Sequence, residues 1–110
     1  MKIKKSKAER FLRVSAIGDM EAYDAERFEN EVFACINKGD KNIILDLGEL
    51  VYICSSGLRA LLNIRTRLEK EGGRLVLTSL KEKVLEVLRI SKLLGIFEIV
   101  KDPKDIEGIS

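Results

Sequence analysis

The sequence contains no histidine and no tryptophan, and it has two cysteines, Cys35 and Cys54. The absence of histidine excludes Ser–His and Cys–His catalytic pairs and also histidine phosphorelay chemistry. The two cysteines form no C-x-x-C pair, and without histidine two distant thiols make a poor metal site. We therefore expect neither a metal nor a cofactor.

Aromatic residues are also scarce, at 5% of the chain, so there is little on which nucleic-acid bases could stack. Basic residues do crowd the N-terminus, at Lys2, Lys4, Lys5, Lys7, Arg10 and Arg13. Lysines commonly guard a solvated edge strand against unwanted pairing, and we favour that interpretation over a nucleic-acid contact. No nucleic-acid partner is expected.

Long apolar runs are missing too. No stretch approaches the length needed to cross a bilayer, and no apolar run of a signal peptide follows the N-terminus. We expect a cytoplasmic protein without a membrane span. The 110 residues contain no Pro/Gly/Ser-rich linker, which predicts a single domain over residues 1–110, monomeric when free.

The chain shows an alternation of strand and helix patterns. The expected strands lie within residues 1–7, 11–17, 42–47, 74–78 and 96–100. Gly18 is expected to end the second of them. Helices that alternate with such strands predict an α/β fold with a mainly parallel or mixed sheet.

Three helices are expected, each after a polar capping residue. The predicted caps are Asp24, then Ser55 or Ser56, then Ser79 with Glu82 in the capping-box position. Residues 48–52 are expected to form a loop, and the tail from residue 102 to be loose or weakly helical.

The most informative segment is residues 45–62, in which a buried strand leads through a loop to two serines, a glycine and an amphipathic helix. A phosphate on Ser55 would meet unpaired backbone N–H groups at the positive end of that helix. Gly57 would permit close approach of another protein. The alternative is that Ser55 and Ser56 only cap the helix.

This segment resembles the signature of the STAS family, which is named for sulphate transporters and anti-sigma factor antagonists. Residues 45–47 match its strand with Asp, Tyr52 matches its aromatic position, and residues 55–58 match its phosphorylation loop. Three further segments resemble the family in register, so that the resemblance covers nearly the whole chain. They are residues 17–21, 72–77 and 87–97.

The resemblance implies a STAS-like fold, a small mixed or parallel sheet of four to five strands with helices packed mainly on one face. It also implies an anti-sigma factor antagonist that binds an anti-sigma factor when unphosphorylated. That partner is itself a serine kinase that phosphorylates Ser55, with Ser56 as second choice, and a phosphatase reverses the step. The chain has no kinase or phosphate-loop motif, so we expect a substrate of the kinase and not an enzyme.

The expected partner-binding surface combines the loop, the helix start and the acidic positions of the family's partner-binding loop. Its members are Asp19, Glu21, Tyr52, Cys54, Ser55, Ser56, Gly57, Leu58 and Arg59. Helix-end electrostatics is the alternative explanation of Asp19 and Glu21. Arg59 and Arg65 are either partner contacts or solvated helix charges.

One residue departs from the family pattern, because Cys54 stands where an acid usually precedes the serine. This departure keeps a second hypothesis open, a constitutive STAS scaffold subunit of a transporter or signalling assembly that is not regulated by phosphorylation. A hydrolase that uses Ser55 or Cys54 is a third, but the chain offers it no evident base. Cys54 itself is either a small packing residue or a reactive thiol.

Overall fold

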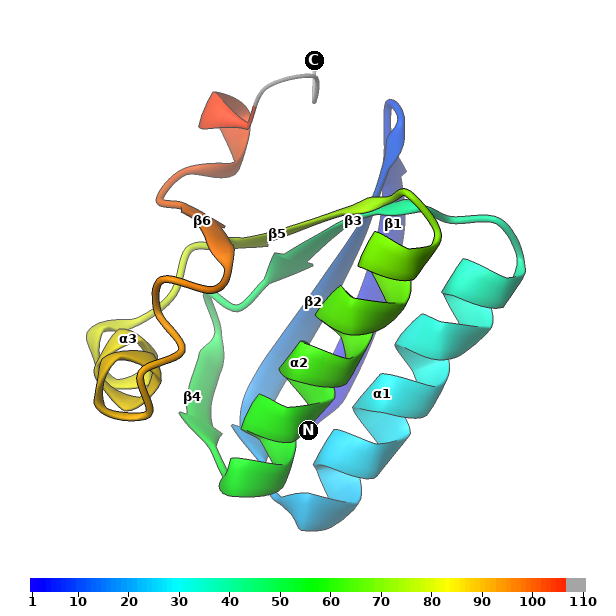
Figure 1. Ribbon diagram of the computed structural model, residues 1–110. Helices are drawn as coiled ribbons and strands as arrows, with labels where there is room; N and C mark the ends of the chain where they lie inside the picture. The colour runs from blue at the N-terminus through cyan, green and yellow to red at the C-terminus, as the bar shows by residue number, and fades with distance from the viewer. Residues whose placement is uncertain (107–110) are drawn as a thin grey trace.

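The computed structural model describes residues 1–106 (Figure 1). Its elements, in chain order, are β1 (Lys2–Ala8), β2 (Phe11–Met20), α1 (Ala22–Asn37), β3 (Asn42–Asp46), β4 (Leu50–Ile53), α2 (Ser55–Lys70), β5 (Arg74–Thr78), α3 (Glu82–Ile90), β6 (Glu98–Val100) and a short 3₁₀ turn, η1 (Pro103–Asp105). The tail after Asp102 is thus partly helical, as predicted, whereas residues 107–110 lie outside the described part of the chain.

The strands form a mixed six-stranded sheet in the order β1-β2-β3-β5-β6, with β4 paired to β2 alone. The pair β1–β2 is antiparallel and the other pairs are parallel. Helices α1 and α2 lie side by side across one face, and α3 lies beside β4 (Figure 1). The predicted α/β fold with helices mainly on one face is confirmed, with one strand more than expected.

The additional strand is β4, which the sequence predicted as a loop. All four of its residues are apolar, so the sequence does not reveal which of them face the core. Leu50 and Ile53 are buried, but Val51 and Tyr52 between them are exposed. The strand therefore lacks the apolar–polar alternation by which a half-buried strand is recognised.

Gly18 does not end β2, as we had expected, but bends it. Its φ angle of 101° lies in the region that favours glycine, and its N–H donates to the Glu49 carbonyl at 2.9 Å. The pairing register shifts between Gly18 and Asp19, which marks an irregularity of the β-bulge type. Through it β2 pairs with β3 along its first part and with β4 along its last.

Two of the predicted helix caps are also wrong. Asp24 lies inside α1, where its Oδ2 accepts a hydrogen bond at 3.0 Å from the N–H of Glu21, the actual N-cap. Ser79 lies in the loop before α3 with a φ angle of 64°, and Lys81 is the N-cap, so Glu82 begins the helix. In both cases the predicted N-cap lies only two or three residues from the actual one.

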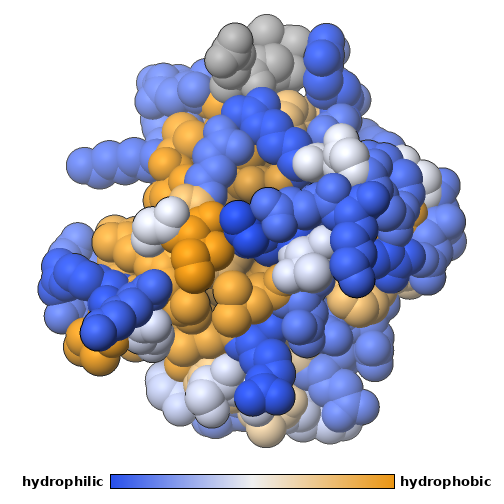
Figure 2. Space-filling model, in the orientation of Figure 1, coloured by the Kyte–Doolittle hydropathy of each residue, from blue (hydrophilic) through white to orange (hydrophobic). Residues whose placement is uncertain are grey.

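The main core lies between the sheet and the inner sides of α1 and α2. Its largest fully buried side chains there include Phe28 and Ile36 of α1 and Leu61 and Ile64 of α2. The opposite face of the sheet has a smaller cluster, formed by Phe11, Ile44, Val76 and Ile106. The outer surface at α1 is largely hydrophilic (Figure 2), as expected for an amphipathic helix on a sheet.

Helix α2 approaches β4 closely at Gly57. A Cβ atom there would lie 2.5 Å from Cγ1 of Ile53 and 3.0 Å from Sδ of Met20. Gly57 is buried, so internal packing is sufficient to explain the glycine.

We expect Gly57→Ala to lower the free energy of unfolding by at least about 1 kcal/mol, because the added methyl group overpacks the contact with Ile53 and Met20. The loss should appear even though alanine is the better helix former by about 1 kcal/mol. Urea denaturation followed by circular dichroism measures it. Gly95→Ala is the control, since nothing lies within 4 Å of a Cβ at that position. Equal losses in both variants would refute the packing explanation.

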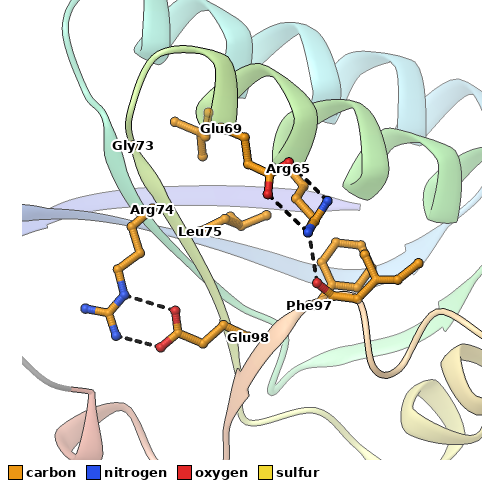
Figure 3. Close-up of a pocket in the computed structure, with 9 residues that line it drawn as sticks. Arg65, Glu69, Gly73, Arg74, Leu75, Phe97 and Glu98 are labelled. Carbon is orange, nitrogen blue, oxygen red and sulfur yellow. Dashed lines mark hydrogen bonds and ion pairs between the residues drawn. The ribbon is translucent and has the colours of Figure 1, made fainter.

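An ion pair joins the neighbouring strands β5 and β6 at the edge of the sheet. The guanidinium of Arg74 donates to the carboxylate of Glu98 through two bonds of 3.0 and 2.6 Å (Figure 3). Hydrogen bonding from Arg74 lowers the pKa of Glu98, with help from Coulomb attraction and against a smaller opposing effect of desolvation.

The lowered pKa of Glu98 means that the folded state gains stability above the ordinary pKa of the carboxyl group and loses it as the pH falls through the folded-state pKa. We expect Glu98→Gln to be less stable than the native chain at neutral pH by under about 1 kcal/mol, because the pair is largely exposed. The two proteins should unfold at the same urea concentration once Glu98 is protonated. A difference that persists unchanged in acid would contradict an ionic origin.

Candidate functional site

The N-terminus of α2 is fixed by its capping residue, Cys54. The Cys54 N–H donates to the Met20 carbonyl at 3.0 Å, and the Cys54 carbonyl accepts from the N–H groups of Gly57 and Leu58 at 2.9 and 3.1 Å. The helix therefore begins one residue earlier than predicted. Ser55 occupies its first position, and neither the Ser55 nor the Ser56 side chain caps it.

Both serines of the first turn are exposed. Their hydroxyls make no hydrogen bond within residues 1–106, so neither is used to hold the fold. The backbone N–H groups at the start of a helix lack intrahelical acceptors, and the helix dipole places positive partial charge there. This end of α2 is accordingly a favourable place for an added phosphoryl group.

The structure brings Asp19 and Glu21 to the same surface. They flank Met20, whose carbonyl binds the Cys54 N–H, and both side chains are exposed. Tyr52 is the register partner of Asp19 across the β2–β4 pair, and it is 47% exposed. Residues from two distant segments of the sequence thus meet near Cys54, at the start of α2.

The remaining predicted site residues lie on α2, some on its buried side and some on its exposed side. Gly57 and Leu58 are buried, and Leu58 belongs to the main core, so neither offers much side-chain surface to a partner. Arg59 is exposed. Arg65, another candidate contact, donates to the Ile96 carbonyl at 3.0 Å and pairs with Glu69, and so fastens α2 to the segment before β6.

The structure contains an apolar groove that the sequence did not predict. It has a volume of about 280 Å³ and lies between β4 and α3, with Val51, Tyr52, Val84 and Val87 among its lining residues. Lys83 and Glu86 complete its α3 side. Figure 2 shows apolar surface in this region, between α2 and α3. The consecutive apolar residues Val51 and Tyr52 in an expected loop were the available signal.

A second hollow, of about 210 Å³, lies near the other end of α2 (Figure 3). It is lined by Arg65 and Arg74, but each of these guanidinium groups already pairs with a carboxylate, from Glu69 and Glu98 respectively. The charges in this hollow are therefore largely balanced, and we assign it a structural role.

The cysteines and acidic residues suggest no metal centre in the part of the chain that the structure describes. Cys35 is buried in the core and Cys54 is half-buried, and both are free thiols. Within residues 1–106, no three side chains of His, Cys, Asp or Glu come together as metal ligands. No helix in this range has the length and apolar character needed to cross a membrane.

Comparison with known proteins gives consistent results. The model of the STAS domain matches residues 2–106. BtrV of Bordetella bronchiseptica, which is named as an anti-sigma factor antagonist, is 39% identical over 99 residues, covering 90% of this chain and 85% of BtrV.

Solved structures share the fold. An anti-sigma factor antagonist of Thermotoga maritima superposes with a TM-score of 0.89 at 26% identity, covering 94% of this chain and 89% of that one. The Bacillus cell fate determinant SpoIIAA, in its phosphorylated form, gives a TM-score of 0.77 at 18% identity, covering 99% and 100%.

The family match extends from the first strand to Ile106, the last residue that the structure describes. It therefore includes the sheet, the helices and the serine-bearing start of α2. The close relative spans most of both chains, so the likeness is not confined to one motif. The chain belongs to the STAS-domain family of anti-sigma factor antagonists.

Proposed function

We propose that this protein binds an anti-sigma factor in its unphosphorylated form and is switched off by phosphorylation at Ser55. The observation that carries the proposal is the exposed, unused hydroxyl of Ser55 in the first turn of α2. The anti-sigma factor itself acts as the kinase. The Ser55 oxygen forms a bond to the γ-phosphorus of ATP as the bond to the β-phosphate oxygen breaks, and ADP and the hydroxyl proton leave.

A phosphatase reverses the modification by hydrolysing the Ser55 phosphate ester with water. The chain itself is a binding module and the substrate of both enzymes. Because the kinase uses ATP, the proposed location is the cytoplasm, and the free protein is proposed to be a monomer of one domain. SpoIIAA has a structure in a phosphorylated form, so the same fold accommodates a phosphoryl group in that protein.

Charge is the first means by which phosphate opposes binding. A phosphoserine carries roughly −1.5 to −2 charges at neutral pH. On Ser55 this charge is added to a surface that already contains Asp19 and Glu21, both exposed. A partner that fits the unmodified surface then meets a bulkier and more negative one, which raises the cost of removing water from the contact.

The groove between β4 and α3 supplies the apolar part of the proposed interface. Val51 and Tyr52 are 52% and 47% exposed, and their strand leads directly into Cys54 and Ser55. Interface centres are enriched in aromatic side chains, and a few such residues contribute most of the binding energy. The groove is lined as far as Ile53, two residues before Ser55, so we propose that one partner contacts both.

We expect Ser55→Ala to bind the anti-sigma factor and to resist inactivation by ATP, because no acceptor oxygen remains at that position. Intact-mass spectrometry with site mapping, after incubation with ATP and the anti-sigma kinases of the same organism, measures the modification. Ser56→Ala is the matched control and should still gain one phosphate. If Ser55→Ala is phosphorylated and Ser56→Ala is not, Ser56 is the acceptor.

The same experiment tests the alternative that the protein is a constitutive STAS scaffold without regulation by phosphorylation. Cys54 keeps this alternative open because it replaces the acid that usually precedes the serine. A stable complex between the native chain and an active kinase, with no phosphate on the chain, would refute the switch. Such a result would favour a STAS scaffold subunit of a larger transporter or signalling assembly.

We expect Val51→Asp to weaken the anti-sigma factor complex by about tenfold or more, because a carboxylate in the apolar groove must be desolvated on binding. Isothermal titration calorimetry measures the affinity. Ile96→Asp, at a 39% exposed residue of the second hollow, is the control and should bind normally. Equal weakening by both substitutions would place the contact elsewhere.

A further inference from the structure

The helix that carries Ser55 has three arginines, and one of them has no partner among residues 1–106. Arg65 pairs with Glu69, and Arg67 pairs with Glu71, each four residues later. Arg59 is exposed and makes no hydrogen bond or ion pair with any other residue in the range 1–106. Its position is thus open to a negative group that the unmodified chain does not provide.

The residue four positions before Arg59 is Ser55. Residues at this spacing are neighbours on a helix surface, with Cβ atoms roughly 5–6 Å apart. Long side chains on a helix generally point back towards its N-terminus, which places the first turn of α2 within reach of Arg59. A negative group four residues N-terminal to a positive one is also the more favourable order for such pairs.

We propose that Arg59 is an intramolecular clamp for the phosphoryl group on Ser55, an inference that rests on the proposed function. The planar guanidinium donates paired N–H groups to two phosphate oxygens, a geometry suited to phosphate recognition. The pair has the same i,i+4 spacing as the pairs that Arg65 and Arg67 form with carboxylates further along, with the order of the charges reversed.

The clamp gives phosphorylation a second consequence. Arg59 is one of the side chains that the free protein presents beside its serines, and pairing with phosphate withdraws it from a partner. The modification then removes a positive contact while it adds negative charge. Phosphate at this position also stabilises the first turn of α2, because it lies at the positive end of the helix.

Two carboxylates compete with phosphate for Arg59. The arginine lines a groove of about 370 Å³ between α1 and α2, together with Glu26, Glu29 and also Ser56, the neighbour of Ser55. Glu29 accepts a hydrogen bond from Asn63 at 3.0 Å, and neither carboxylate forms an ion pair with Arg59 in the structure described for residues 1–106. A phosphate dianion on Ser55 carries more negative charge than either carboxylate. We therefore expect Arg59 to pair with the phosphate in preference to Glu26 or Glu29.

The test uses the full chain with phosphoserine incorporated at position 55 during translation, so that no kinase is required. Phosphorus NMR during a pH titration gives the second proton dissociation constant of the phosphate. Because Arg59 favours the dianion, we expect this constant to be about twofold larger in the native background than in Arg59→Gln. Arg59→Lys keeps the positive charge but lacks the planar guanidinium, so its dissociation constant should lie between those of the native background and Arg59→Gln.

Arg67→Gln is the matched control, since it removes the same charge from the same helix beside Glu71. It should leave the dissociation constant unchanged, and all variants should agree in urea, where the helix is unfolded. Equal constants for the native background and Arg59→Gln in the folded state would overturn the clamp, as would an equal effect of Arg67→Gln. If the clamp is observed but no kinase modifies Ser55, the clamp holds and the proposed function fails.

Discussion

One backbone hydrogen bond organises the site, the 3.0 Å bond from the Cys54 N–H to the Met20 carbonyl. It joins the last residue of β2 to the residue that begins α2. The chain leaves β2 into α1 through Glu21, the N-cap of α1, so that both helices start from the same place on the sheet (Figure 1). The serines of α2 and the acidic residues at the end of β2 share a surface because of this bond.

The bond depends in turn on the irregular path of β2. If β2 stayed in register with β3 over its whole length, its final residues would not pair with β4. The positive φ angle of Gly18 and the register shift after it redirect the strand, and the buried side chains of Leu50 and Ile53 hold β4 in place. Because Leu50 and Ile53 anchor β4, the exposed side chains of Val51 and Tyr52 remain available to line the groove with α3.

The sequence predicted those elements that depend on neighbouring residues and missed those that depend on contacts between distant segments. Strand β5 was found from its short continuous apolar run and the helix after Ser55 from the helical spacing of its apolar residues, and both signals are local. Strand β4 was missed because its pairing with β2 and its contact with α3 lie far away in the sequence. The cap of α2 was misplaced by one residue for the same reason, since Met20 and not a serine hydroxyl fixes where that helix begins. The family resemblance predicted the neighbourhood of Ser55, but the groove had to be seen in the structure.

The cysteine at the cap changes the electrostatics of α2 in a way that favours phosphate. Helices α1 and α3 each have an acidic residue in the first turn, Asp24 and Glu82, whereas α2 has none. An acid in place of Cys54 would accept hydrogen bonds from the first N–H groups and would repel a second negative group beside it. The Cys54 side chain makes no capping hydrogen bond, so no side-chain charge offsets the helix dipole there, although the Cys54 carbonyl accepts from the Gly57 and Leu58 N–H groups. The departure from the family pattern thus removes a neighbouring negative charge that would repel a phosphate on Ser55.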